Sequence, residues 1–254
     1  MNKIFTSRRN FLKSATLGSA VLSSNSPLSI SKEAQISKYS NSIGVSTCPS
    51  ATAYEQHMGT DNLTNGAASA GATTITVDDA DKANFAFNVG DLISFSSANS
   101  SSDVTAFAHL AGDEGNEYEI TGISTNALTI RLKDDPNGAG LKAAIADDSF
   151  IRRRWRFYDL FDGAPGTSDW ATANGRGTGD ELHIAVYDAT GDITGYDNDV
   201  AGGRTSSVIE IYGNVSKNPV SKTAQGGSNY YPDVIFRQSA YIYWTDHLSA
   251  GTNW

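Results

Sequence analysis

The feature that most constrains the fold is a short apolar run at residues 182–187, LHIAVY, with Gly and Asp on both sides. A run of this length between turn residues is typical of a buried strand. Asp188 ends it, and a Gly-containing turn follows. Because a strand without a polar face must be covered on both sides, we expect the C-terminal half of the chain to be arranged around it.

Residues 60–150 show a second pattern, in which apolar and polar residues alternate between Gly, Asn and Asp turns. Alternation of period two is typical of half-buried antiparallel strands, and the short Ser124–Asn126 connection predicts a hairpin. We therefore predict a small all-β barrel or sandwich. Its strands are expected at 73–77, 92–95, 117–123 and 127–132.

The C-terminal part predicts two helices and a strand. Val208, Ile211, Tyr212 and Val215 have helical spacing within 205–216, and a capping box precedes them. Pro232 can open a second, short helix, and residues 241–244, YIYW, are typical of a strand. This order predicts an open sheet with parallel neighbours, in which 182–187 and 241–244 could lie side by side.

The charge distribution excludes several functions. Residues 41–150 hold fifteen acidic and four basic side chains, which argues against a nucleic-acid partner. No run reaches the ~20 apolar residues needed to cross a membrane. The one cysteine, Cys48, cannot form an internal disulfide. We interpret it as a small buried hydrophobe rather than a nucleophile paired with His57.

Residues 1–40 form a basic leader in which Arg8 and Arg9 precede Phe11, Leu12 and a weakly apolar stretch. This pattern resembles a twin-arginine export signal, and a disordered basic tail is the alternative. Residues 41–59 are interpreted as a linker or as an N-terminal piece of the core.

A run of positive charge lies at residues 150–156, FIRRRWR. Two interpretations are open. The arginines could form an exposed patch that contacts a neighbouring copy of the chain, or they could be solvated at a strand edge. The candidate subunit-contact residues are Arg152, Arg153, Arg154 and Arg156.

Acidic clusters occur at residues 78–81, 113–114 and 134–135. None has the ligand spacing of a calcium loop, so we interpret them as solvated surface loops.

Several pieces of residues 161–254 together resemble the core of contractile tail sheath proteins of bacteriophages. Each piece is unspecific, but their order and spacing agree over about the last 95 residues. The pieces are APGTS at 164–168, DELHIAV at 180–186, Asp188, Gly191 and ITG at 193–195, VSK at 215–217, GSNYY at 227–231, DVI at 233–235, YIYW at 241–244, and Asp246-His247.

The resemblance implies an α/β sheath core at 151–254, with a layer of subtilisin-like fold, and an inserted β-rich domain at 60–150. Sheath proteins carry a further C-terminal domain beyond this core, so the resemblance implies an incomplete core and a truncated sheath chain. In such a sheath, many copies surround a tail tube and contract to deliver the genome.

The resemblance therefore implies a structural subunit of the virion without cofactor or metal. Its expected partners are other sheath copies and the tail tube protein, and neither nucleic acid nor membrane. A triad is not expected, because no Gly-Thr-Ser follows Asp188 and His247, and His183 is interpreted as a packed core residue. The alternative function is a β-rich envelope or binding protein that is exported through Arg8 and Arg9 and has no catalytic activity.

Overall fold

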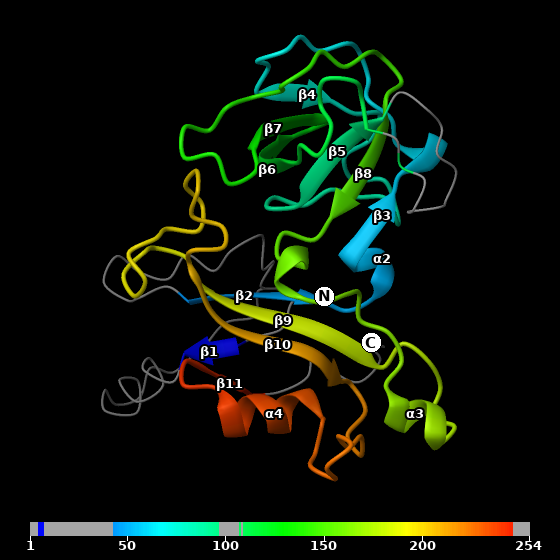
Figure 1. Ribbon diagram of the computed structural model, residues 1–254, viewed down its shortest axis with the longest axis vertical. Helices are drawn as coiled ribbons and strands as arrows, with labels where there is room; N and C mark the ends of the chain where they lie inside the picture. Colours follow the sequence, from blue (N-terminus) through cyan, green and yellow to red (C-terminus); the bar gives the residue numbers. More distant parts are fainter. Residues whose placement is uncertain (1–4, 8–42, 97–106, 108, 246–254) are drawn as a thin grey trace, which may run out of the picture.

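The structure is a computed structural model that describes residues 5–7, 43–96, 107 and 109–245. These residues are mostly strands with few helices, arranged as a six-stranded body above a three-stranded sheet (Figure 1). Both sheets are antiparallel and open.

The six-stranded sheet has the order β3-β8-β5-β6-β7-β4, and its strands come from residues on both sides of the 60–150 segment as well as from within it. The predicted strands at 92–95, 117–123 and 127–132 and the hairpin between the last two are confirmed. The strands are β3 (Glu55–His57), β4 (Thr74–Thr76), β5 (Leu92–Ser96), β6 (Tyr118–Ser124), β7 (Ala127–Leu132) and β8 (Phe150–Arg154).

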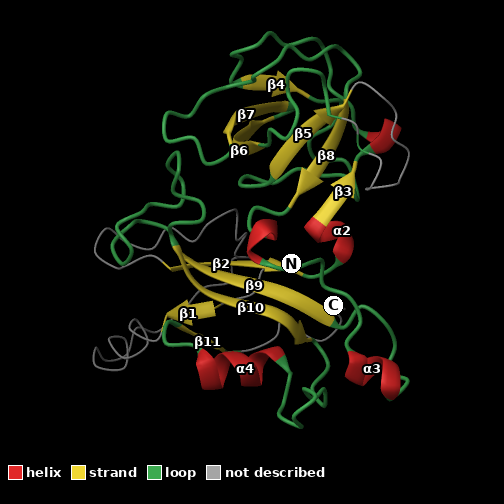
Figure 2. Cartoon of the chain, in the orientation of Figure 1, coloured by secondary structure: helices red, strands yellow, loops and turns green. Residues whose placement is uncertain are grey.

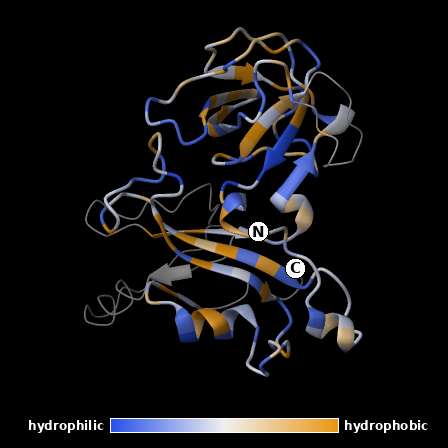
Figure 3. Cartoon of the chain, in the orientation of Figure 1, coloured by the Kyte–Doolittle hydropathy of each residue, from blue (hydrophilic) through white to orange (hydrophobic). Residues whose placement is uncertain are grey.

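One apolar core lies within this body, as the alternating sequence requires. Ile93, Phe95, Ile120, Leu128 and Ile130 are at most 1% exposed. Figure 3 shows the apolar residues concentrated on β5, β6 and β7, and polar residues on β8 and β3. The polar strand β8 is therefore the unusual member of the sheet.

The three-stranded sheet has β9 (Glu181–Asp188) at its centre, between β10 (Val208–Ser216) and β2 (Ile43–Cys48). The predicted strand at 182–187 is thus confirmed as the buried centre of this layer. The helix α4 (Tyr231–Gln238) and strand β11 (Ile242–Trp244) cover one face of it (Figure 2). Both were expected from the sequence.

The other face of the sheet packs against residues that follow β8. Trp155 and Phe157 form an apolar cluster with Cys48 and Ala185. The remaining short elements are α2 (Ala51–Tyr54), η1 (Gly59–Asp61), η3 (Tyr158–Leu160), α3 (Asp169–Ala173) and β1 (Phe5–Ser7), which pairs with β11.

The helix predicted at 205–216 is wrong, because residues 208–216 form strand β10. Its ladder with β9 shifts register twice, between Val208 and Glu210 and between Tyr212 and Val215. The four apolar residues do not share one face, because Tyr212 and Val215 pack with α4, Val208 packs in the cluster of Trp155 and Phe157, and Ile211 is 48% exposed. The second bulge adds one residue between Tyr212 and Val215, so these two share a face at the three-residue spacing of a helix. The β-branched residues of the segment suit the strand.

The predicted parallel arrangement is also wrong. β9 pairs antiparallel with β2 and β10, and β11 pairs with β1 rather than with β9. The error follows from the missed strands β2 and β10, which occupy both edges of β9. No helix in the described ranges is both long and apolar enough to cross a membrane.

Candidate functional site

The arginine run occupies the interior of the six-stranded sheet. β8 lies between β3 and β5, and Arg152, Arg153 and Arg156 are at most 8% exposed. Both interpretations from the sequence, an exposed patch and a solvated edge, are therefore wrong for these three residues. Buried guanidinium groups need carboxylate partners, and distant parts of the chain supply them. In the single chain they are not presented to a neighbouring copy.

Arg154 joins two carboxylates on one side of β8. Its Nε donates to Glu55 Oε2 at 2.9 Å and its Nη1 to Glu117 Oε1 at 3.0 Å. Glu117 also accepts hydrogen bonds from Tyr158 at 2.6 Å and Lys133 at 3.0 Å. Burial alone would raise the pKa of Glu117, but these hydrogen bonds and charges outweigh it and lower that pKa. Glu117 therefore stays ionised as the centre of the cluster.

Arg153 is paired with Asp91, with Nη1 3.3 Å from Oδ2. Its Nη2 also donates to the Thr52 carbonyl and to Gln56 Oε1, both at 3.1 Å. Burial raises the pKa of Asp91, although Arg153 and hydrogen bonds from Asn88 act in the opposite direction. Each charge of this pair thus depends on the other for compensation.

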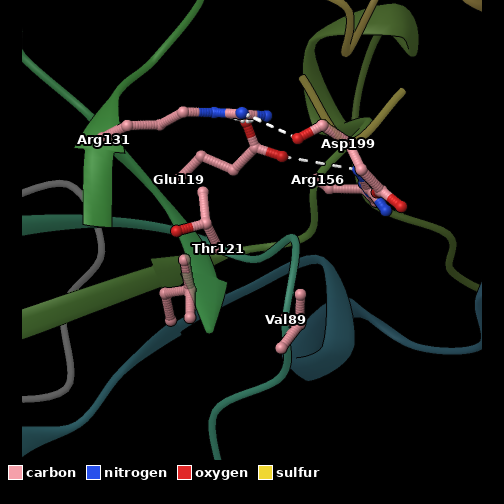
Figure 4. Close-up of a pocket in the computed structure, with 7 residues that line it drawn as sticks. Val89, Glu119, Thr121, Arg131, Arg156 and Asp199 are labelled. Atoms are coloured by element: carbon pink, nitrogen blue, oxygen red, sulfur yellow. Dashed lines mark hydrogen bonds and ion pairs between the residues drawn. The ribbon is translucent and has the colours of Figure 1, made fainter. Parts of the chain in front are cut away.

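A third group lies where the body meets the β9–β10 connection (residues 189–207), and Figure 4 shows it around a small cavity. Arg131 binds Glu119 Oε2 through Nε at 3.0 Å and Nη2 at 2.8 Å, and its Nη1 donates to the Asp199 carbonyl at 2.8 Å. Arg156 is 3.4 Å from Glu119 and 3.8 Å from Asp199. The cavity measures about 150 Å³ and is lined by Val89, Glu119, Ile120, Thr121, Arg131, Arg156 and Asp199.

Arg204, in the same connection, is fully buried and holds two carboxylates. Its guanidinium is bidentate to Asp134 at 3.2 and 2.8 Å and to Asp159 at 2.9 and 2.8 Å. Burial would raise the pKa of Asp159, but the hydrogen bonds and charge of Arg204 outweigh it and lower that pKa to about 2. Asp159 and Arg204 therefore remain charged over the ordinary pH range.

Part of this network, which was not predicted, does have a signal in the sequence. Glu117 and Glu119 alternate on one arm of the predicted hairpin, and Arg131 and Lys133 alternate on the other. Glu119 lies directly opposite Arg131 in the ladder. Opposite charges at matched positions of a hairpin predict cross-strand pairs. Arg204 had no such signal, because its partners are far away in sequence.

Two carboxylates at the ends of β9 fix loops. Asp180 accepts hydrogen bonds from the hydroxyl groups of Ser168 at 2.8 Å and Ser216 at 2.5 Å, and so joins three segments. Asp188 accepts four backbone N–H groups of the turn that follows β9. Burial would raise both pKa values, but these hydrogen bonds lower them. Neither carboxylate is placed to orient a catalytic base.

His183 is a packed core residue, as the sequence analysis predicted. It is 1% exposed, and its ring stacks on Phe161 with centroids 4.3 Å apart. Nδ1 accepts the Asn214 N–H at 3.0 Å, so Nε2 carries the proton and donates to the Gly163 carbonyl at 2.7 Å. Burial lowers the pKa of His183. Both nitrogens are occupied, and the ring is neutral.

Cys48 is also buried, as predicted. It lies opposite His183 in the β2–β9 ladder, but its thiol faces the Ser50 carbonyl at 3.5 Å. Burial raises the pKa of Cys48 to about 12, which leaves almost no thiolate. Arg8, Arg9 and His247 lie outside the described residues.

The acidic clusters differ from one another. Asp78, Asp79 and Asp81 are exposed, as predicted. Asp113 contradicts the prediction, because it is 1% exposed and accepts the Tyr118 hydroxyl. Asp134 is part of the Arg204 group. In the described ranges, no group of three His, Cys, Asp or Glu residues could hold a metal ion.

The described polar groups thus organise structure, and the Arg204 group joins the β9–β10 connection to Asp134 and Asp159. Comparison with protein-family models, curated proteins and solved structures finds no match for this chain.

Proposed function

We propose that this chain belongs to a contractile tail sheath subunit, a structural protein that assembles with its own copies around a tail tube. One observation carries the proposal. The polar residues of the sheath-like pieces, Asp180, His183 and Asp188, use their side chains to fix the strands and turns of one layer. Residues used in this way support a scaffold role rather than catalysis.

The open sheets provide surfaces that suit assembly. β2 and β10 are the edges of the three-stranded sheet in the described ranges. A strand edge carries backbone groups that another chain can pair with. Ile211 on β10 and Val220 after it are 48% and 55% exposed, so apolar side chains accompany that edge. Both features favour contacts between copies.

The proposal includes the finer fold that the resemblance implies, a sheath-type α/β core with a subtilisin-like layer and an inserted β domain. On this view, the partners are other copies and the tail tube protein, and the assembly belongs to the virion. Contraction would be a change between two packings of the subunits, driven by contact free energy without a cofactor.

The test is assembly of the full chain in the presence of a tail tube protein, followed by sedimentation and electron microscopy. We expect tubular or ring-like polymers. Ile211→Asp at the β10 edge should reduce them strongly, while the matched change Ser124→Asp, at an exposed end of β6, should not. A chain that remains monomeric with the tube protein at every concentration would contradict the proposal.

The rival function, export through Arg8 and Arg9, is disfavoured by one observation. Phe5–Ser7 pairs with β11, so a segment directly before the arginine pair takes part in the fold. Fusion of residues 1–40 to a reporter tests the rival. A reporter that stays in the cytoplasm supports the sheath proposal, whereas export that is lost on changing Arg8 and Arg9 to Lys would establish the rival.

A further inference from the structure

The six-stranded body contacts the lower sheet in two chemically different places. The first is an apolar joint directly after the C-terminal end of β8, formed by Trp155 and Phe157 against Cys48 and Ala185. All four are at most 6% exposed. Apolar packing of this kind is strong but has little directional preference.

The second contact is a charged seam between the body and the β9–β10 connection (Figure 1), which begins beside this joint, where Arg204 donates to the Arg156 carbonyl. Arg204 of the connection binds Asp134 of the β7–β8 loop and Asp159 of η3. Arg131 of β7 donates to the Asp199 carbonyl. Hydrogen bonds between charged groups are directional, so this seam sets the angle between the two parts.

The seam is not packed like a protein core. Beside Arg131 and Asp199 it borders the charged cavity of about 150 Å³, which is large enough for several water molecules. Two carboxylates of the seam reach solvent, because the Asp134 and Asp199 side chains are 41% and 55% exposed. Water can therefore solvate these groups when the seam separates.

The hydrogen bonds of Arg204 are arranged so that one side can open. If Asp134 moves away, Arg204 keeps its bidentate bond to Asp159 and its bond to the Arg156 carbonyl. Lys133, beside Asp134, also pairs with Asp159 at 3.0 Å, and it keeps its pair with Glu117 when that contact breaks. Opening thus leaves no unpaired buried charge, which is the main cost of breaking a buried ion pair. Asp134 leaves with the body, and its carboxylate becomes hydrated.

We propose that the Arg204–Asp134 pair is an ionic latch that fixes the orientation of the six-stranded body, and that the apolar joint at Trp155 and Phe157 is the pivot on which the body turns when the latch opens. This device is independent of the proposed function, since it concerns the motion of one chain. Loss of the latch should shift the docking equilibrium roughly tenfold or more toward the open form, given the strength of hydrogen bonds between charged groups.

The test measures one distance across the seam. Ser124→Cys in the body and Thr172→Cys in α3 are exposed positions for spin labels. Buried Cys48 will not react. Asp134→Gly removes the latch acceptor without backbone strain, because Asp134 has a φ of 57°. Asp148→Gly is the matched control, since Asp148 has the same φ of 57° and an exposed side chain in the loop before β8.

We expect one narrow distance distribution in the parent and in Asp148→Gly, and a broadened or second distribution in Asp134→Gly. Asp134→Asn, which keeps a weaker acceptor, should fall between them. Circular dichroism verifies that each variant is folded. If Asp134→Gly and Asp134→Asn give the parent's distribution, the joint alone fixes the orientation and the latch proposal is wrong.

Discussion

Arg153 and Asp91 show how single residues determine the character of the six-stranded sheet. Both are buried, and their charges lie 3.3 Å apart. A buried pair of this kind contributes little net stability compared with apolar residues, but removal of one partner leaves a buried charge without compensation. The pair therefore favours one arrangement of β8 against the loop before β5.

The corresponding prediction concerns Arg153→Met. We expect the free energy of unfolding to fall by about 3–5 kcal/mol, because Asp91 keeps its burial and loses its counter-charge. The double variant Asp91→Asn/Arg153→Met should recover much of this loss. Urea unfolding measures both, with the exposed Arg176→Met as the control. Equal losses in the single and double variants would contradict the prediction.

His183 predicts a pH dependence. Its folded-state pKa is lowered by burial, so the folded chain binds fewer protons than the unfolded chain. Its contribution to stability is present above the unfolded pKa of about 6.5 and is lost as pH falls through the folded pKa. Unfolding measured between neutral and mildly acidic pH should show this decline. In His183→Gln the decline should be smaller, while His109→Gln, which also removes a histidine of lowered pKa, serves as the comparison.

The strand β10 shows how an element can imitate another in its sequence. Its second bulge puts Tyr212 and Val215 on one face at a helical spacing of three, and Asn214 at this bulge has a φ of 49°. The N–H of Asn214 also donates to His183. The bulge thus serves the packing of the central strand, which a helix in this position could not do.

At this bulge, Asn214→Val should lower the free energy of unfolding by about 1–3 kcal/mol, because β-branched residues are strained in the left-handed region. Asn214→Gly has no such strain and should be close to neutral. Thermal unfolding of the two variants tests the assignment directly. If valine were tolerated as well as glycine, the left-handed bulge would be absent in solution.

At the scale of the whole molecule, the chain passes repeatedly between its two sheets. β2 ends only seven residues before β3 begins, yet the two strands belong to different sheets. β8 and β9, which follow one another along the chain, also belong to different sheets. The joint around Trp155 packs these crossings together, and Trp155 Nε1 donates to the Ser46 hydroxyl at 2.8 Å. We therefore expect the two sheets to unfold as one cooperative unit.

Trp155→Ala should break this cooperativity. A cavity of this kind costs about 3–5 kcal/mol, and the loss falls at the contact between the sheets. Calorimetry should show a single transition in the parent and a calorimetric enthalpy above the van't Hoff value in the variant. Trp170→Ala, in the half-buried helix α3, is the control. A two-state transition in Trp155→Ala would show that the charged seam is sufficient to couple the sheets.

The sequence alone determined the local elements whose pattern depends on neighbouring residues. The period-two strands β5, β6 and β7, the apolar strand β9 and the helix opened by Pro232 could be predicted because each pattern repeats within a few residues. The packed state of His183 followed for the same reason, since it lies in an apolar run, whereas that of Cys48 followed from the usual burial of a lone cysteine.

The tertiary structure alone decided which charged residues pair with one another and which strands are neighbours. The arginines of β8 and Arg156 look like a surface patch in the sequence. In the structure, Glu55 and Glu117 pair with Arg154, and Glu119 pairs with Arg156. The antiparallel order around β9 and the Arg204 latch likewise join segments that are distant along the chain. A charged residue is exposed or buried according to whether the fold brings a counter-charge to it, and no local pattern contains that information.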